Sequence, residues 1–317
     1  MSALLSSFGL GAEAAARIAA IGPDIGPDML AATRALFAPH HDLLPPPGGE
    51  LRPDAPYGED PRQAMDICLP ADPRGRPILL FVPGGGFVGG DKRGSAHIPA
   101  FFARAGYVAA AMNYRLAPAH GWPAGARDVA AALDHLAALA AALGADAGRI
   151  FVIAESAGAA HSAAALLDAR FQPKCLAGVR AALLLSGMFE LKAEPRNDRL
   201  VAYYGEPDGY ADRSPLANIA QEGPRILLGI SERDPAFIAP STYAMAHALA
   251  ERRGVSVPVI WFEGHNHVSP MMSLAPPAAR SARRSTAASR ARHELHRAAD
   301  LDPPACDLHR RQHRRRL

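Results

Sequence analysis

Apolar runs of strand length alternate with amphipathic stretches of helix length along most of this 317-residue chain. The strand-like runs lie at residues 78–82, 107–113, 150–154, 182–186, 226–230 and 257–262, and a further run at 63–69 is predicted to be an edge strand. The helix-length stretches lie at residues 97–105, 124–143, 157–170 and 242–253. Because strands that are apolar on both sides must be covered on both faces, the alternation predicts an α/β fold with a mainly parallel sheet between helices.

The composition fits a large α/β domain and argues against several other classes of protein. Apolar residues make up 49% of the chain and charged residues 21%, which is enough to build a sizeable core. No apolar run approaches the roughly 18 residues of a membrane span, and the N-terminus does not resemble a signal peptide. The three cysteines (Cys68, Cys175 and Cys306) are far apart, so we expect no disulfide framework, no metal site and a cytoplasmic location.

Residues 154–158 read Ala-Glu-Ser-Ala-Gly and join a predicted strand to a predicted helix. This context is typical of the nucleophile elbow G-x-S-x-G, in which a sharp turn presents the serine at the edge of a sheet. Ser156 is therefore the candidate nucleophile, with the helix N-terminus behind it. Ala154 stands where the pattern has glycine, and we expect its methyl group to strain the elbow. If it does, Ala154→Gly should raise activity or stability.

An acyl-transfer site also needs a base and an acid that orients it, and both candidates follow predicted strands. Asp234 and His267 come after Ser156 in the chain order Ser…Asp…His of α/β-hydrolases. His267 would take the proton from Ser156, and Asp234 would hold the imidazole in the productive tautomer. Glu232 and His265 are the alternatives for the acid and the base. We favour Asp234 and His267.

A glycine-rich turn at residues 83–87 follows the strand at 78–82. Glycines allow backbone N–H groups to point into a cavity without obstruction by Cβ atoms. We assign the binding of the oxyanion to the N–H groups of Gly85, Gly86 and Ala157. Phosphate binding is the competing use of such a turn, but G-x-G-x-x-G and a G-K-[ST] ending are both absent.

The segment 190–222 interrupts the alternation and is irregular. An insertion near the carboxyl ends of strands is a usual place for a cap over a pocket, and a long surface loop is the alternative. The candidate pocket walls are Phe87, Phe189, Tyr203 and Tyr204. For each of them, plain packing in the core is the alternative.

The chain resembles the α/β-hydrolase superfamily, and most closely the bacterial carboxylesterases related to hormone-sensitive lipase and arylformamidase. The resemblance runs from about Tyr57 to Ser269, and its motifs lie at residues 81–87, 113–118, 122–128, 155–158, 234–235 and 264–267. It implies an α/β-hydrolase fold with an eight-stranded, mostly parallel sheet and a small helical cap, without metal or cofactor. It also implies a structural ion pair between Arg115 and Asp128 below the site.

Pro83 departs from the family pattern, which has histidine at this position. Proline cannot steady the oxyanion loop through side-chain hydrogen bonds, although it restricts its own φ and the residue before it. The N–H donors of the following glycines remain. We therefore expect weakened or retuned activity and a retained nucleophile.

We expect three parts in the chain: an N-terminal helical cap and linker (1–50), a catalytic domain (51–274) and an atypical tail (275–317). The tail has 11 arginines, no lysine and 4 acidic residues, and few large apolar residues. A native tail that binds nucleic acid or anionic membrane, a solvated extension, and a change of reading frame after about Leu274 are the three interpretations. We favour the change of reading frame.

Together these features predict a serine carboxylesterase that hydrolyses small, short-chain esters through an acyl-enzyme intermediate. An amidase of the arylformamidase type would use the same residues, and a catalytically weakened hydrolase-fold binding protein is the alternative from another class. We expect a small-molecule ester as the partner, no nucleic acid unless the tail is native, no membrane, and a monomer or homodimer.

Overall fold

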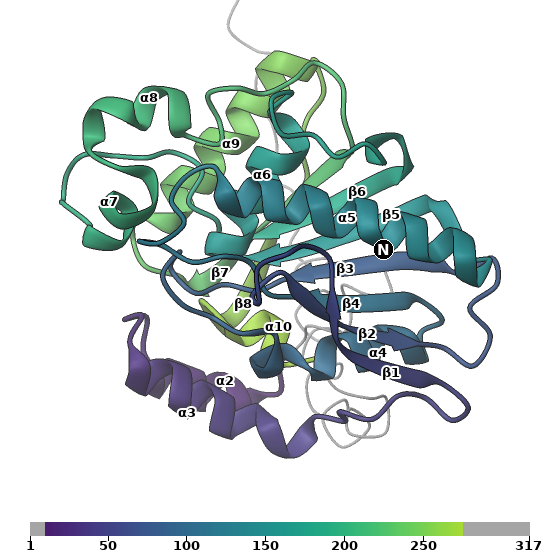
Figure 1. Cartoon of the computed structure of the whole chain (residues 1–317). Coiled ribbons are helices and arrows are strands. Elements are labelled where there is room, and N and C mark those ends of the chain that lie inside the picture. The colour runs from purple at the N-terminus through teal and green to yellow at the C-terminus, as the bar shows by residue number, and fades with distance from the viewer. Residues whose placement is uncertain (1–9, 275–317) are drawn as a thin grey trace, which may run out of the picture.

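Eight strands form one sheet in the order β1-β2-β4-β3-β5-β6-β7-β8 (Figure 1). The computed structural model describes residues 10–274, so the predicted tail at 275–317 lies outside the described residues. The strands are β1 (Glu50–Pro56), β2 (Ala64–Leu69), β3 (Pro77–Val82), β4 (Val108–Met112), β5 (Asp146–Glu155), β6 (Val179–Leu185), β7 (Arg225–Arg233) and β8 (Val259–Asn266). The pairs β1–β2 and β2–β4 are antiparallel and the other five are parallel. The predicted eight-stranded, mostly parallel sheet is confirmed.

The predicted edge position of the strand at 63–69 is wrong, because β1 pairs along its outer side. β1 contains Pro53 and Pro56, and none of its residues is buried. Its register against β2 shifts between Arg52 and Ala55, around a proline that has no N–H to donate to the ladder. An edge strand tolerates this interruption of the ladder. The two prolines also explain why the sequence did not predict β1 as a strand.

The helices cover both faces of the sheet. They are α2 (Ala12–Ile21), α3 (Pro27–Phe37), α4 (His97–Arg104), α5 (Ala124–Leu143), α6 (Ala157–Leu167), α7 (Asp198–Tyr204), α8 (Tyr210–Arg213), α9 (Ile238–Arg253) and α10 (Ser269–Met272). Short 3₁₀ turns occupy Ala38–His40, Lys92–Ser95, Leu176–Gly178 and Pro207–Gly209. Within the described residues, no helix combines the length and apolar character that a membrane span would need.

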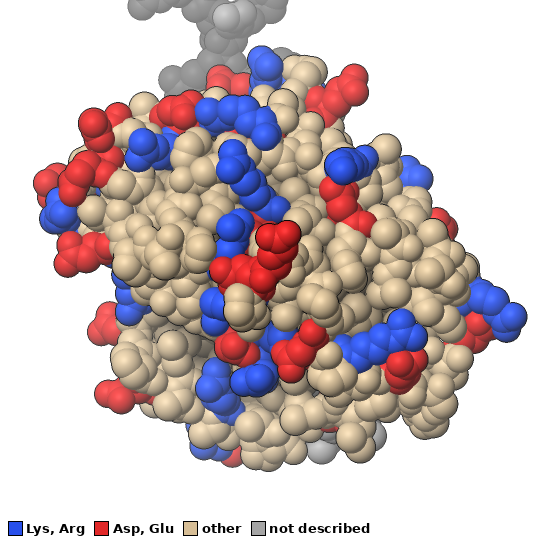
Figure 2. All heavy atoms as spheres, in the orientation of Figure 1, with Lys and Arg blue, Asp and Glu red and all other residues tan. Residues whose placement is uncertain are grey.

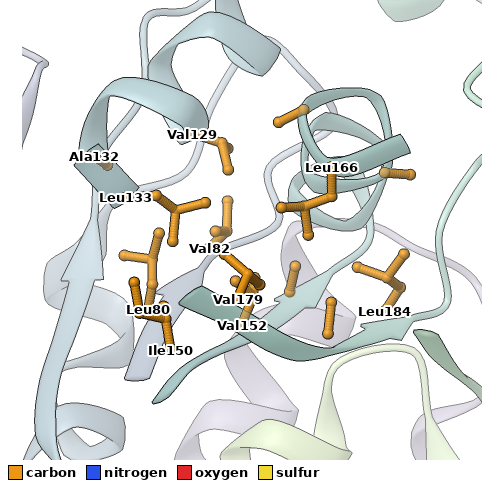
Figure 3. Close-up of a cluster of buried hydrophobic side chains, with 14 of the residues drawn as sticks. Leu80, Val82, Val129, Ala132, Leu133, Ile150, Val152, Leu166, Val179 and Leu184 are labelled. Atoms are coloured by element: carbon orange, nitrogen blue, oxygen red, sulfur yellow. The ribbon is translucent and has the colours of Figure 1, made fainter. Parts of the chain in front are cut away.

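The larger core lies between the sheet and the layer of α5, α6 and α9. Figure 3 shows part of it, with Val129 and Leu133 of α5 and Leu166 of α6 above the strand residues Leu80 and Val152. The smaller core lies on the other face, under α4 and α10. These two layers hold the strands in place, so the residues at their carboxyl ends have fixed positions.

Helix α6 lies unusually close to the sheet because most of its side chains are methyl groups or smaller. All residues of Ala157–Leu167 are buried. A Cβ on Gly158 would lie 2.4 Å from the carbonyl oxygen of Val82 and 2.5 Å from that of Pro83. Glycine is therefore required at position 158 for the start of α6 to meet the end of β3.

We expect Gly158→Ala to lower the free energy of unfolding by about 3 kcal/mol, because the added methyl group must displace backbone rather than a flexible side chain. The matched control is Gly89→Ala, where a Cβ would meet only the carbonyl oxygen of Gly85 at 3.5 Å. The control should change stability by less than about 1 kcal/mol. Denaturant unfolding of the two variants measures this difference, and equal stabilities would contradict the close approach.

Candidate active site

Ser156 occupies the turn between β5 and α6 with backbone angles of φ 53° and ψ −123°. A positive φ is costly for a residue with a side chain, and such strain is typical of functional turns. The turn is held by the N–H of Ser156, which donates to the carbonyl of Leu185 at 2.8 Å. Ala154, where we expected the strain, keeps regular register with Val82 and Leu184, and its methyl group is buried in the main core. The strained residue is thus the serine itself.

The structure brings Ser156, His267 and Asp234 together in one chain of hydrogen bonds. His267 Nε2 lies 2.8 Å from Ser156 Oγ, and His267 Nδ1 lies 2.7 Å from Asp234 Oδ1. The side chains of His267 and Asp234 are each only 2% exposed. Because a carboxylate accepts but does not donate, Nδ1 carries the proton of the neutral ring, and Nε2 is left to accept from the serine hydroxyl.

Asp234 is held by two donors besides His267. Its Oδ2 accepts from the backbone N–H of Ser231 at 2.8 Å and from the hydroxyl of Ser186 at 2.7 Å. Ser186 directly follows β6 and has a φ of 49°, so its backbone is also in the strained left-handed region. The sequence analysis did not single out Ser186, since no motif marks it beyond its place at the end of a strand.

The two alternatives for acid and base are occupied elsewhere. The carboxylate of Glu232 accepts the backbone N–H of Gly264 at 2.6 Å and pairs with Arg233 at 3.1 Å. His265 Nδ1 lies 2.8 Å from Ser269 Oγ. Of the four candidates, Asp234 and His267 are therefore the two that the structure connects to Ser156.

The glycine-rich turn lies beside Ser156 and lines the same cavity. Gly85 and Gly86 have φ values of 154° and 60°, and Phe87 follows with a φ of 70°. A Cβ on Gly85 would lie 2.0 Å from the carbonyl oxygen of Gly89, so this turn cannot form with a larger residue. Within residues 10–274, the N–H groups of Gly85, Gly86 and Ala157 have no hydrogen-bond acceptor. They are available to a ligand.

The glycine-rich turn is held in place through the backbone of Pro83. The hydroxyl of Tyr114, which is almost fully buried, donates to the carbonyl of Pro83 at 3.1 Å. Below it, the predicted ion pair is confirmed: Arg115 Nη2 lies 2.7 Å from Asp128 Oδ1, and Asp128 is wholly buried. Gln63 also donates to Asp128, at 2.8 Å.

Glu155, immediately before the candidate nucleophile Ser156, lies in the candidate site and was missed by the sequence analysis. It is partly buried and lines the cavity beside Ser156. Burial raises the pKa of Glu155 to about 7, while the positive charge of protonated His267 and a hydrogen bond from the N–H of Gly84 oppose this rise. The one feature of the sequence that could have pointed to Glu155 is its place as an acidic residue inside the elbow at residues 154–158.

Ser156, His267, Glu155 and the glycine-rich turn line a cavity of about 1160 Å³. The segment from Asp24 to Arg34 contributes to one side of it, and the segment from Met188 to Leu200 contributes to another. In Figure 1 the pair α2–α3 lies beside α10, and α7 lies above them on the same side of the molecule. Only residues up to Leu200 of the predicted insertion at 190–222 line the cavity.

Phe87 alone among the four predicted pocket walls lines the cavity. Phe189 is wholly buried in the main core. Tyr203 stacks on Phe87 at 5.1 Å between ring centroids, and Tyr204 meets it edge-on at 5.2 Å. The hydroxyl of Tyr203 also accepts the N–H of Gly125 at 3.1 Å. The two tyrosines therefore form a layer behind Phe87 and are not themselves walls.

Among the described residues, no group of three or more His, Cys, Asp or Glu side chains is arranged to hold a metal ion. Cys68 is buried and Cys175 is partly buried, both as free thiols.

The chain is similar to proteins described as esterases. A family model described as BD-FAE matches residues 65–177. Esterase LipC of Mycobacterium tuberculosis is 30% identical over 249 residues, which cover 68% of this chain and 60% of LipC. The isoprenylcysteine alpha-carbonyl methylesterase ICME of Arabidopsis thaliana is 25% identical over 69% of this chain and 49% of its own length. The chain thus spans less than two thirds of the length of these relatives.

Solved structures give the same fold. A bacterial heroin esterase is 26% identical, with a TM-score of 0.63, over 85% of this chain and 94% of that structure. EstE1, a thermostable carboxylesterase cloned from a metagenomic library, is 22% identical, with a TM-score of 0.61, over 82% of this chain and 92% of that structure. The predicted α/β-hydrolase fold is confirmed.

The raised pKa of Glu155 predicts a pH-dependent effect of Glu155→Gln on stability. A carboxyl with a pKa of about 7 in the folded state and an ordinary value of 4.5 binds its proton more tightly when folded. Its contribution to stability is therefore lost as the pH rises from 4.5 to 7 and stays constant above that. The variant should gain stability relative to the parent protein across this range.

Unfolding in denaturant at pH 4.5, 6, 7 and 8 measures the effect. The exposed Glu222 serves as control, and Glu222→Gln should follow the parent protein at each pH. A difference between Glu155→Gln and the parent that does not change with pH would show that Glu155 keeps an ordinary pKa.

Proposed function

Because the chain belongs to the α/β-hydrolase esterase family, we propose that it is a serine carboxylesterase that hydrolyses small, short-chain esters. The observation that carries the proposal is the hydrogen-bonded chain from Ser156 through His267 to Asp234, with distances of 2.8 and 2.7 Å, at the wall of a cavity. Nucleophile, base and orienting acid in this arrangement are the parts of a catalytic triad.

In the proposed reaction Ser156 Oγ attacks the ester carbonyl while its proton moves to His267 Nε2. The carboxylate of Asp234 stabilises the imidazolium that forms. The C–O bond to the alcohol then breaks, and His267 returns the proton to the leaving alkoxide, which leaves an acyl group on Ser156. A water molecule repeats the sequence on the acyl-enzyme, with His267 again as base and then as acid.

The oxyanion of each tetrahedral intermediate would lie against the N–H groups of Gly85, Gly86 and Ala157. All three lack an acceptor within the described part of the chain, so none must give up a hydrogen bond to bind the oxyanion. Ala157 is also the first residue of α6, where the helix dipole favours negative charge. One such donor contributes about 10²–10³ in kcat.

Phe87 supports a short acyl chain. It lines the cavity directly after the oxyanion loop, and Tyr203 and Tyr204 close the space behind its ring.

We also propose that α2 and α3 act as a cap, since Ile25, Leu30 and Arg34 line the cavity. The substrate would then bind between this cap and the strand ends.

A fluorophosphonate probe should label Ser156, because the probe reacts with an activated serine and its phosphoryl oxygen can occupy the oxyanion position. Ser156→Ala should abolish both the label and the hydrolysis of p-nitrophenyl acetate. Ser162→Ala is the control. Ser162 is a buried serine of α6, the helix that follows Ser156, and its hydroxyl has no partner among the described residues. Mass spectrometry locates the adduct, and an adduct elsewhere on folded protein would refute the proposal.

Ser186→Ala should lower kcat about tenfold with little change in KM, because Asp234 loses one donor and holds His267 less firmly. Ser162→Ala should leave both parameters unchanged. An unchanged kcat in Ser186→Ala would mean that Ser186 does not position Asp234 for the reaction.

A further inference from the structure

Four cationic side chains of Lys or Arg line the cavity, and only two of them have acidic partners. Lys192 pairs with Glu190 at 3.2 Å, and Arg196 pairs with Glu206 at 3.2 Å and with Asp198 at 3.4 Å. In the described part of the chain, no carboxylate lies within 4.0 Å of the guanidinium groups of Arg34 or Arg199. These two arginines therefore offer unoccupied donors to whatever fills the cavity.

Arg199 lies against the oxyanion loop. Its Nη1 is 2.9 Å, and its Cδ 3.1 Å, from the point where a Cβ on Gly86 would lie. Its helix, α7, begins at a firm cap, because Asn197 Oδ1 accepts the N–H groups of Arg199 at 3.0 Å and Leu200 at 3.4 Å. The same helix carries Tyr203, whose ring stacks on Phe87, the residue after Gly86. The backbone of Arg199 thus has a defined place, and its exposed guanidinium lies beside Gly86, one of the proposed oxyanion donors.

Arg34 is anchored to the other end of the site. Its neighbour Thr33 is wholly buried and accepts a hydrogen bond from Asn266 Nδ2 at 2.9 Å, and Asn266 directly precedes His267. Arg34 Nη2 lies 3.1 Å from the point where a Cβ on Gly94 would lie, in the turn that follows the oxyanion loop. Both unpaired arginines are therefore fixed to elements that carry the reacting groups.

Most of the acidic residues of the cavity are not placed to neutralise these arginines. Asp91 accepts from the N–H of Arg93 at 2.9 Å and from Asn113 Nδ2 at 3.1 Å. Glu155 is largely protonated below a pH of about 7, because burial raises its pKa to that value. Asp24 and Glu194 are exposed, and neither lies within ion-pair distance of Arg34 or Arg199. The described residues thus place no carboxylate against Arg199 beside Gly86, and a bound substrate could supply that negative charge.

We propose that Arg199, assisted by Arg34, binds a carboxylate on the ester, so the preferred substrates are short esters that carry a negative charge, such as half-esters of dicarboxylic acids. This inference rests on the proposed esterase function. A planar guanidinium binds a carboxylate with two parallel hydrogen bonds, which makes it selective for this group over a methyl terminus of the same size.

The test compares esters that differ only in this charge. Monoethyl glutarate and ethyl pentanoate carry the carboxylate or a methyl group at the end of the acyl chain, and hydrolysis of both is followed in a pH-stat. Arg199→Gln should lower kcat/KM for monoethyl glutarate about tenfold and leave ethyl pentanoate within about twofold. Arg34→Gln should lower kcat/KM for monoethyl glutarate about threefold. Arg196→Gln, the paired arginine on the same segment, should change the ratio of the two substrates by less than twofold.

A second pair of substrates, 4-acetoxybenzoate and phenyl acetate, places the carboxylate on the alcohol side. A selective loss with either charged ester in Arg199→Gln supports carboxylate binding and identifies the side on which the anion sits. Raising NaCl from 0.05 to 0.5 M should reduce the preference for the charged ester in the parent protein but not in Arg199→Gln, because salt screens an exposed ion pair.

An unchanged ratio of charged to neutral hydrolysis in Arg199→Gln for both pairs would overturn the inference. This outcome differs from a failure of the esterase itself, in which the parent protein would hydrolyse neither ethyl pentanoate nor phenyl acetate. Circular dichroism of each variant establishes that it is folded before the ratios are compared.

Discussion

The junction between β5 and α6 touches the end of β3 at a point where no side chain fits, and the geometry of the site depends on that contact. Gly158 lets the first turn of α6 lie against the carbonyls of Val82 and Pro83. The chain can then reverse at Ser156 only through a positive φ, which the bond from its N–H to Leu185 helps to hold. The same contact places the N–H of Ala157 beside the glycine-rich turn that continues from β3. The proposed nucleophile and the proposed oxyanion donors thus share one origin in backbone packing.

The loop after β3 shows how one support can replace another. Without a histidine at position 83, the loop depends on Tyr114, whose buried hydroxyl donates to the carbonyl of Pro83. Tyr114 is fixed in turn from below, since the next residue, Arg115, pairs with the wholly buried Asp128. Glu155 accepts the N–H of Gly84 from the side of the nucleophile. A proline that lacks a donor is tolerated here because the loop is held through backbone groups that proline still offers.

The proximity of the three proposed triad residues could be predicted from the sequence because a parallel sheet brings the carboxyl ends of its strands to one edge. Ser156, Asp234 and His267 each follow a strand with a clear apolar pattern, so their proximity follows from topology alone. Ser186, which binds Asp234, also follows a strand, but one hydroxyl among many carries no spacing that marks it. Tyr203 and Tyr204 have the right chemistry for pocket walls. Only the three-dimensional packing places them behind Phe87.

The proposed recognition of a carboxylate could not be predicted in the same way, because it depends on segments that lack the period of a strand or of a sheet-covering helix. Arg34 and Arg199 come from an N-terminal helix and from the irregular insertion, 165 residues apart in the chain. On the face in Figure 2, positive and negative side chains are interspersed, so net charge gives no sign of where an unpaired arginine lies. The two arginines are located by contacts of their own helices. Thr33, next to Arg34, accepts a hydrogen bond from Asn266, the residue before His267, and Tyr203, on the helix of Arg199, stacks on Phe87, the residue after Gly86. A change in either segment would therefore shift a proposed recognition group together with its anchor, which would couple the choice of substrate to the alignment of His267 and the glycine-rich turn.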